Sequence, residues 1–178
     1  MSDRKVAQTA PDGIGDEHAR PTAGWRRHAS PLSLAVFGAV IALSLFGVLG
    51  HERDWRAQQN GVSLEVHAPE TIRNGEFFET RISVASDDRR IDELVIGIEQ
   101  ALWEDITVNT MIPAATDEES VDGAFKFTFA ELEPGTVFLL KFDLQVNPDI
   151  VGGNEGRVTV YDGDEVLVET MVSMTVLP

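Results

Sequence analysis

Apolar and polar residues alternate with a period of two over most of the chain beyond residue 61. Successive side chains of a β-strand point to opposite faces, so this alternation is typical of strands that bury one face. The alternating runs occupy residues 62–66, 78–84, 94–98, 106–112, 125–129, 138–146, 158–160 and 166–176. No stretch beyond residue 61 has a convincing helical period, although residues 93–106 could include one short helical turn. The pattern therefore predicts an all-β domain.

Residues typical of turns separate these runs, at 73–76, 86–90, 133–136 and 147–149. Seven or eight strands joined by such turns predict an immunoglobulin-like antiparallel β-sandwich over residues 62–178. The chain has no cysteine, so the disulfide of antibody domains is missing and only their architecture is expected. A domain of roughly 115 ordered residues can still bury a working core without disulfides or metals.

Residues 31–50, PLSLAVFGAVIALSLFGVLG, contain no charged side chain. As a helix, this run would span about 30 Å, the thickness of the hydrocarbon core of a bilayer. A cleaved signal peptide is the alternative, but the polar leader of 30 residues and the lack of a small-x-small site before His51 favour a retained anchor. The run predicts one transmembrane α-helix ahead of the β-sandwich.

Tryptophan and arginine residues flank this run on both sides. Trp25, Arg26 and Arg27 precede it and Trp55 follows it, which predicts four anchors at the membrane interface. The arginine pair favours a cytoplasmic N-terminus, so we expect a single-pass protein of the inner (plasma) membrane. The expected parts are a disordered cytoplasmic tail at 1–30, the helix at 31–50, a juxtamembrane stalk at 51–61 and a periplasmic or extracellular domain at 62–178.

Small residues recur at four-residue spacing within the predicted helix. Ala35 and Ala39 form one such pair, and Gly38 and Ala42 form another. This spacing lets a second helix approach closely, although chance is the favoured reading because small residues are common in any membrane helix. The pattern suggests a helix-packing face for another integral membrane protein.

The charge of the chain is concentrated in its C-terminal part. Residues 1–30 hold 5 basic and 4 acidic side chains, whereas residues 51–178 hold 9 and 26, a net charge of −17. Nucleic acids and anionic lipid headgroups both require basic patches. Nucleic-acid binding is therefore excluded as an expected function.

The stretch LQVNPDIVGGNEGRVTVYDGDE, residues 144–165, concentrates glycine and acidic residues. Asp162 and Gly163 form a strong hairpin signal between two strands, and the earlier glycines would let the connection bend. Calcium is the alternative, but the spacing of an EF-hand loop is absent, so calcium binding is disfavoured. The glycines follow no strand-to-helix junction, which excludes a phosphate-binding loop. A second acidic cluster, TDEES at 116–120, is expected to be a solvated loop tip.

Catalytic residues are not evident in the predicted domain. His67 is its only histidine beyond the membrane boundary, and it shares a polar strand face with Glu65. One histidine cannot form a zinc site, and without cysteine the usual nucleophile–base pairs are missing. We therefore expect no enzyme, no cofactor and no metal.

Three phrases, LWEDITVNTMIP (102–113), LQVNPDIVG (144–152) and VYDGD (160–164), resemble those of an uncharacterised family of bacterial single-pass membrane proteins. This family, loosely associated with YetF-like membrane proteins, combines one N-terminal helix with a small all-β extracytoplasmic domain. The resemblance covers residues 30–178. It implies no activity and supplies no catalytic residue.

These observations predict a non-catalytic accessory subunit that contacts the bilayer and another integral membrane protein. Sandwich loops around Trp103, Asn109, Asn147 and Pro148 are the expected contact regions, although a core position is the favoured reading for Trp103 itself. The alternative is a tethered adhesion or glycan-binding module, which would require exposed aromatic side chains. Most phenylalanines lie on predicted core faces, and Tyr161 is the single tyrosine.

Overall fold

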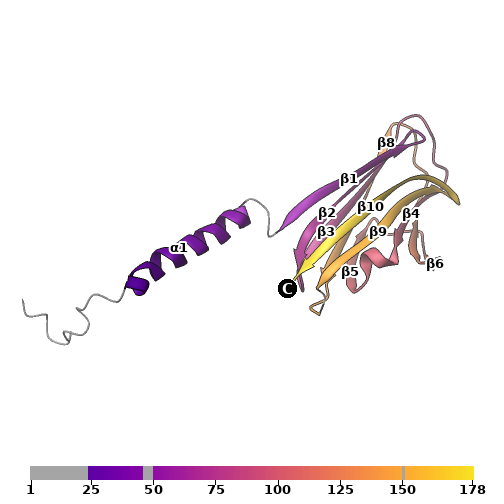
Figure 1. Cartoon of the computed structure of the whole chain (residues 1–178). Coiled ribbons are helices and arrows are strands. Elements are labelled where there is room, and N and C mark those ends of the chain that lie inside the picture. Colours follow the sequence, from indigo (N-terminus) through magenta and orange to yellow (C-terminus); the bar gives the residue numbers. More distant parts are fainter. Residues whose placement is uncertain (1–23, 46–49, 150) are drawn as a thin grey trace, which may run out of the picture. The chain divides into compact units, whose positions relative to one another are not determined.

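The computed structural model describes residues 24–45, 50–149 and 151–178. For residues 24–30 it describes the backbone and not the side chains. The chain divides into two compact units, Met1–Phe46 and Gly47–Pro178. The first contains a helix and the second contains all of the described strands (Figure 1). The predicted disordered tail lies mostly outside the described residues, apart from the first turns of the helix.

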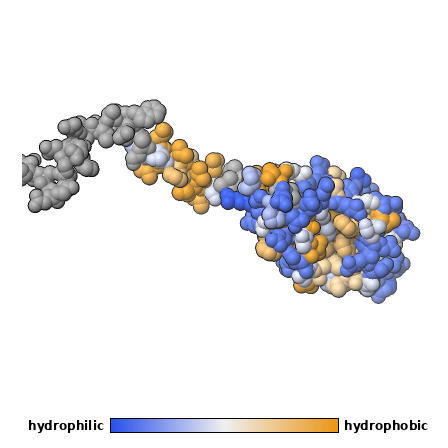
Figure 2. Space-filling model, turned by 90° about the horizontal axis from the view of Figure 1, so that it is seen from below, coloured by the Kyte–Doolittle hydropathy of each residue, from blue (hydrophilic) through white to orange (hydrophobic). Residues whose placement is uncertain are grey.

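The helix α1 runs from Gly24 to Leu45 and contains Pro31. From residue 31 to 45 its side chains are mostly apolar and exposed (Figure 2). Ala35, Gly38 and Ala39 are exposed and Ala42 is half-buried. Among the described residues, no helix is both long and apolar enough to span a membrane.

The predicted interface residues Trp25, Arg26 and Arg27 belong to the first turns of α1. Their side chains lie outside the described part of the structure, so the anchoring role stays a prediction.

The second unit is an all-β sandwich of ten strands with one short 3₁₀ helix, η1 (Gln100–Trp103). The strands are β1 (His51–Gln59), β2 (Val62–Arg73), β3 (Phe77–Ser86), β4 (Leu94–Glu99), β5 (Ile106–Ile112), β6 (Asp117–Val121), β7 (Ala124–Thr128), β8 (Thr136–Val146), β9 (Gly152–Asp162) and β10 (Glu165–Leu177). They pair in the order β5-β8-β3-β2-β10-β9-β4-β7-β6, and β1 pairs with β2.

Strand β2 joins the two halves of the sandwich. One half contains β5, β8 and β3, and the other contains β10, β9, β4, β7 and β6. Its first residues, 62–67, pair antiparallel with β3, and its last, 71–73, pair with β10 in parallel. Buried positions alternate as far as Ala68, and the register with β1 shifts just beyond it. Pro69 has no backbone N–H to donate to a ladder, which suits a position where the strand leaves one half for the other. All other strand pairs are antiparallel, as predicted.

Side chains from both halves meet in one hydrophobic core. Val66 and Phe142 come from one half, and Ile96 and Val160 come from the other; all four are fully buried. A smaller cluster of Ile72, Val146, Met174 and Val176 continues this core. The face of the domain seen in Figure 2 is largely hydrophilic, with scattered apolar patches. The eight predicted strands are confirmed, and so is the sandwich architecture.

Two strands were not predicted. Residues 51–59, expected to be a stalk, form β1, which pairs with β2 along its whole length. Trp55, expected at the membrane interface, instead lies opposite Val66 and is buried in the core with 8% of its surface exposed. Residues 116–120, expected to be a solvated loop tip, belong mostly to β6 (Asp117–Val121), which is paired to β7 and exposed along its length.

Tight turns connect the hairpins as their sequences predict. Asp162 and Glu165 pair at the end of the β9–β10 hairpin, with Gly163 at φ +57° in the turn. Gly75 and Gly123 also have positive φ, in the turns that follow β2 and β6. The hairpin signal at residues 162–163 is therefore confirmed.

A candidate binding groove between β5 and β6

The sandwich has an open side where its pairing order ends. Strand β5 pairs with β8 at one end of the order, and β6 pairs with β7 at the other. The short connection of residues 113–116 links these two edge strands directly. Each edge strand has one side that no described strand occupies.

A groove of about 370 Å³ lies on this open side. We call it the β5–β6 groove; it is lined by Trp103, Val108, Met111, Glu118, Glu119, Ser120, Phe125, Phe127 and Phe142. Its volume is within the range of sites that hold small ligands or short peptide side chains.

The floor of the groove is aromatic. The indole of Trp103 lies 4.8 Å from the ring of Phe142 in an edge-to-face arrangement, and 6.2 Å from the rings of Phe125 and Phe127. Phe127 and Phe142 are themselves 5.4 Å apart. Such ring pairs stabilise a core by about 0.5–1.5 kcal/mol each beyond the burial of their area. The floor is therefore apolar and closely packed, and of its four rings only that of Phe125 is more than 8% exposed.

The 3₁₀ helix η1 places Trp103 in this floor, and β9 holds η1 in position. The side chain of Asn154 donates hydrogen bonds to the carbonyl oxygens of Leu102 (3.4 Å) and Glu104 (2.8 Å). Gly156 lets η1 approach closely, because a Cβ there would lie 2.7 Å from the Cβ of Leu102. The glycine thus serves close packing within a strand, and not the flexible connection expected from the sequence.

The walls of the groove are apolar on one side and acidic on the other. Val108 of β5 is 45% exposed, and Met111 is half-buried against the core. Across the groove, Glu118 and Ser120 of β6 lie opposite Phe127 and Phe125 of β7. Cross-strand partners share a face of the sheet, so Glu118 is on the same face as the aromatic floor.

The carboxylate of Glu118 makes no ion pair with any described residue, and neither does that of Glu119. The nearest basic residue in the pairing, Lys126 opposite Glu119, lies over the ring of Tyr161 at 5.1 Å. The groove therefore combines an apolar floor with uncompensated negative charge.

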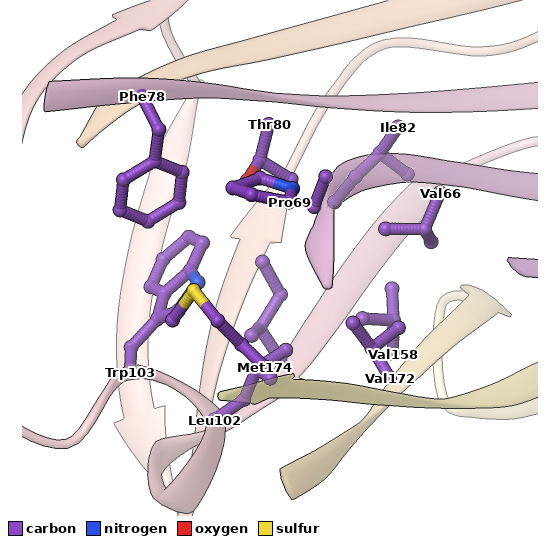
Figure 3. Close-up of a pocket in the computed structure, with 12 residues that line it drawn as sticks. Val66, Pro69, Phe78, Thr80, Ile82, Leu102, Trp103, Val158, Val172 and Met174 are labelled. Atoms are coloured by element: carbon purple, nitrogen blue, oxygen red, sulfur yellow. The ribbon is translucent and has the colours of Figure 1, made fainter. Parts of the chain in front are cut away.

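A second, much smaller cavity lies inside the sandwich next to the groove (Figure 3). It has room for about one water molecule, about 20 Å³. Phe78 points toward Trp103 and Met174, and Val66 faces Val158 and Val172 across the cavity. Its lining is nearly all apolar. Trp103 is shared by this cavity and the groove, so it separates the interior from the open side.

The structure separates the four expected contact residues into three places. Trp103 is 8% exposed and belongs to the core, although its ring also lines the groove. Asn109 is exposed in β5, where the register shifts between Val108 and Thr110. Asn147 and Pro148 follow β8 and do not line the groove.

Asn147 and Pro148 have structural hydrogen bonds of their own. The hydroxyl of Thr107 donates to the side-chain oxygen of Asn147 at 2.9 Å, and the side chain of Asn74 donates to the carbonyl oxygen of Pro148 at 2.9 Å. Both residues thus tie neighbouring turns and strands together at one end of the sandwich.

His67 is the centre of a charged cluster that the sequence did not reveal. Its Nδ1 lies 2.6 Å from Oδ1 of Asp54, and its Nε2 lies 3.2 Å from Oε2 of Glu52. The hydrogen bond to Asp54 is the main cause that raises the pKa of His67, and it also lowers the pKa of Asp54. Both carboxylates come from β1, so the cluster could not be predicted while this segment was taken for a stalk.

Asp162, whose carboxylate belongs to the acidic stretch for which calcium binding is the alternative, has other partners. The backbone N–H groups of Asp92 and Glu93 donate to its Oδ1 at 2.9 and 3.1 Å, and the guanidinium of Arg89 lies 3.3 Å from its Oδ2. Within the described residues no cluster of three or more histidine, aspartate or glutamate side chains is arranged to hold a metal ion.

No family model matches this sequence, and no curated protein matches it either. The resemblance to bacterial single-pass membrane proteins therefore stays a prediction.

Several solved structures are similar to the chain. A chain of a cohesin–dockerin complex from Clostridium thermocellum is 15% identical with a TM-score of 0.39, over 60% of this chain and 89% of that one. The chitin-binding domain of a chitinase from Pyrococcus furiosus is 15% identical with a TM-score of 0.40, over 62% of this chain and 95% of that one. An immunoglobulin-like protein from Pseudomonas aeruginosa is 20% identical with a TM-score of 0.28, over 60% of this chain and 76% of that one. At such low scores these likenesses say nothing of what this chain binds.

Proposed function

We propose that this chain is a non-catalytic, membrane-tethered binding subunit whose β-sandwich contacts another membrane protein. The observation that carries the proposal is the β5–β6 groove, which presents an aromatic floor and free carboxylates between two unpaired strand edges. Apolar area gives affinity in such a surface, and charged groups on its rim give selectivity.

Tethering to the inner membrane is supported by residues 31–50, which contain no charge and match the thickness of a bilayer as a helix. The apolar side chains of Leu34, Phe37 and Ile41 are all more than half exposed on α1. Exposed apolar side chains of this density favour an apolar environment over water. We place the N-terminus in the cytoplasm and the sandwich in the periplasm or outside the cell.

A non-catalytic role is supported by the position of His67. It lies on the polar outer face of β2 between two carboxylates, and the ladder opposite it contributes Arg81 of β3. This environment holds the imidazole as an ion-pair partner. A general base must lie within hydrogen-bond reach of its substrate. His67 and its two carboxylate partners do not line the β5–β6 groove, so a ligand in the groove would not reach them. Glycan binding is less well supported, because the tryptophan of the groove is 8% exposed and offers little stacking surface.

Affinity purification of the tagged full-length chain from its native membranes, in mild detergent, tests this function. We expect a near-stoichiometric integral membrane protein to co-purify. If α1 contributes its small-residue face, the double substitution Gly38→Leu and Ala42→Leu should reduce the partner at least threefold, because larger side chains prevent close helix approach.

The matched control is the pair Val36→Leu and Val40→Leu, which enlarges α1 at positions outside that face. Recovery of the chain alone, from membranes and under several detergents, would contradict the proposed function. Equal loss with both double variants would show that the small-residue face has no specific role.

A further inference from the structure

The two strand edges beside the β5–β6 groove suggest how a partner would bind. A strand at the edge of a sheet presents unpaired N–H and C=O groups, which can accept an additional strand from another chain. Strand β6 is exposed at every position and pairs only with β7 among the described strands. An extended segment beside β6 would therefore gain backbone hydrogen bonds at the open side of the β5–β6 groove.

The position of Glu118 determines which segment fits. This residue points to the inner face of β6, the face that carries Phe127 on the neighbouring strand. An inward charge on an edge strand discourages pairing with an apolar strand, because the carboxylate would be covered without a partner. The same carboxylate favours a strand that brings a cation opposite to it.

Side-chain spacing extends this reasoning to the neighbouring positions. On an added strand, the residues two places away from the cation would share its face and lie near Ser120 and the rings behind it. Of these rings, Phe125 is only half-buried and offers apolar area to aliphatic side chains. The strongly acidic domain would also attract a basic segment before contact.

We propose that the β5–β6 groove binds an extended basic segment of a partner polypeptide, which adds a strand to β6. A lysine or arginine of this segment pairs with Glu118, and an aliphatic residue two positions away packs on Phe125. This inference rests on the proposed function and adds the chemistry and the geometry of the partner.

The probe for this inference is the fluorescein-labelled peptide Val-Thr-Lys-Thr-Val-Thr-Val, titrated against the full-length chain in detergent by fluorescence anisotropy. We expect saturable binding that weakens about fivefold in Glu118→Gln, because a partly desolvated ion pair is replaced by a neutral contact. Glu118→Lys should abolish binding of this peptide and permit binding of its counterpart with glutamate in place of lysine.

Two controls keep the interpretation specific. Glu155→Gln removes the same charge from an exposed position of β9 outside the groove, and it should leave the affinity within twofold. A peptide with proline in place of the threonines cannot form the ladder and should not bind. Hydrogen exchange of the β6 amides should slow on binding of the original peptide.

Lack of binding, equal affinity of wild type and Glu118→Gln, or equal binding of the proline peptide would each overturn this inference. Its failure differs from failure of the proposed function. A membrane partner that co-purifies undiminished with Glu118→Gln would leave the proposed function intact and assign the contact to another surface.

Discussion

At the scale of single residues, Gly156 shows how one hydrogen atom in place of a side chain positions the groove. Any Cβ at this position would meet the backbone N of Leu102 at 2.9 Å as well as its Cβ at 2.7 Å. Backbone atoms cannot move aside as the end of a flexible side chain can. The close approach of η1 to β9, and with it the position of Trp103, therefore depends on this glycine.

Gly156→Ala should destabilise the domain by about 1–3 kcal/mol, because the added methyl group overpacks the contact with η1. The measurement is chemical unfolding of the full-length chain, followed by the loss of β-structure. Gly153→Ala is the matched control in the same strand, because its Cβ would meet only the carbonyl oxygen of Met174 at 3.7 Å. A similar loss in both variants would contradict the role given to Gly156.

His67 gives the domain a pH dependence whose sign follows from its raised pKa. The folded state binds the proton more tightly than the unfolded chain, so this contribution is fully present below the ordinary histidine pKa of 6.5. It is lost as the pH rises through the pKa of the folded state. The lowered pKa of Asp54 acts in the opposite sense, because its contribution is lost as the pH falls below the ordinary aspartate pKa of 3.8.

We expect His67→Gln to reduce the free energy of unfolding more at pH 5 than at pH 8.5. Denaturant unfolding of wild type and variant at both pH values measures this difference. A variant that is equally destabilised at both would assign His67 a packing role and would contradict the ion-pair interpretation.

At the scale of elements, β1 is an edge strand fixed to the sandwich by one large side chain. Its other side chains are exposed or half-buried, whereas Trp55 packs into the shared core. The guanidinium of Arg53 lies 5.6 Å from the ring of Trp55 and covers it from solvent. Burial of this one ring distinguishes a folded strand from the flexible stalk expected here.

Trp55→Ala should destabilise the domain by about 3 kcal/mol and release β1, because it removes a large buried side chain and leaves a cavity. Hydrogen exchange of the β1 and β2 amides reports the release directly. Gln58→Ala, at an exposed position of the same strand, should change neither stability nor exchange by a comparable amount. Unchanged protection of β1 in Trp55→Ala would contradict this account.

The strands that the sequence did not predict share one physical property. Alternation reveals a strand only where one face is buried, and the DEESV sequence of β6 buries nothing. In β1 the apolar signal is reduced to Trp55 and Ala57, too short a run to recognise. The other eight strands were predictable because their apolar residues alternate, with seven of them burying side chains and β5 packing Ile106 and Met111 partly against the core.

Strand β5 shows how local geometry can also alter a correct prediction. The sequence predicts Ile106, Val108, Thr110 and Ile112 on one face. The bulge at Asn109 shifts the register, so that Met111 packs against the core and Ile112 is 57% exposed. A bulge leaves little signal in a single sequence, and the groove that depends on this shift could not be derived from alternation alone.

At the scale of the whole molecule, the pairing of β2 determines how the sandwich responds to tension. Thr71 pairs with His51, the first residue of β1, and with Thr175 near the end of β10. A pull directed away from the sheet on residues that precede His51 would peel β1 from β2 one pair at a time. Peeling would stop where Trp55 enters the core, because further separation must extract the whole indole at once. Under tension the domain would thus release the first few residues of β1 before its core is disrupted.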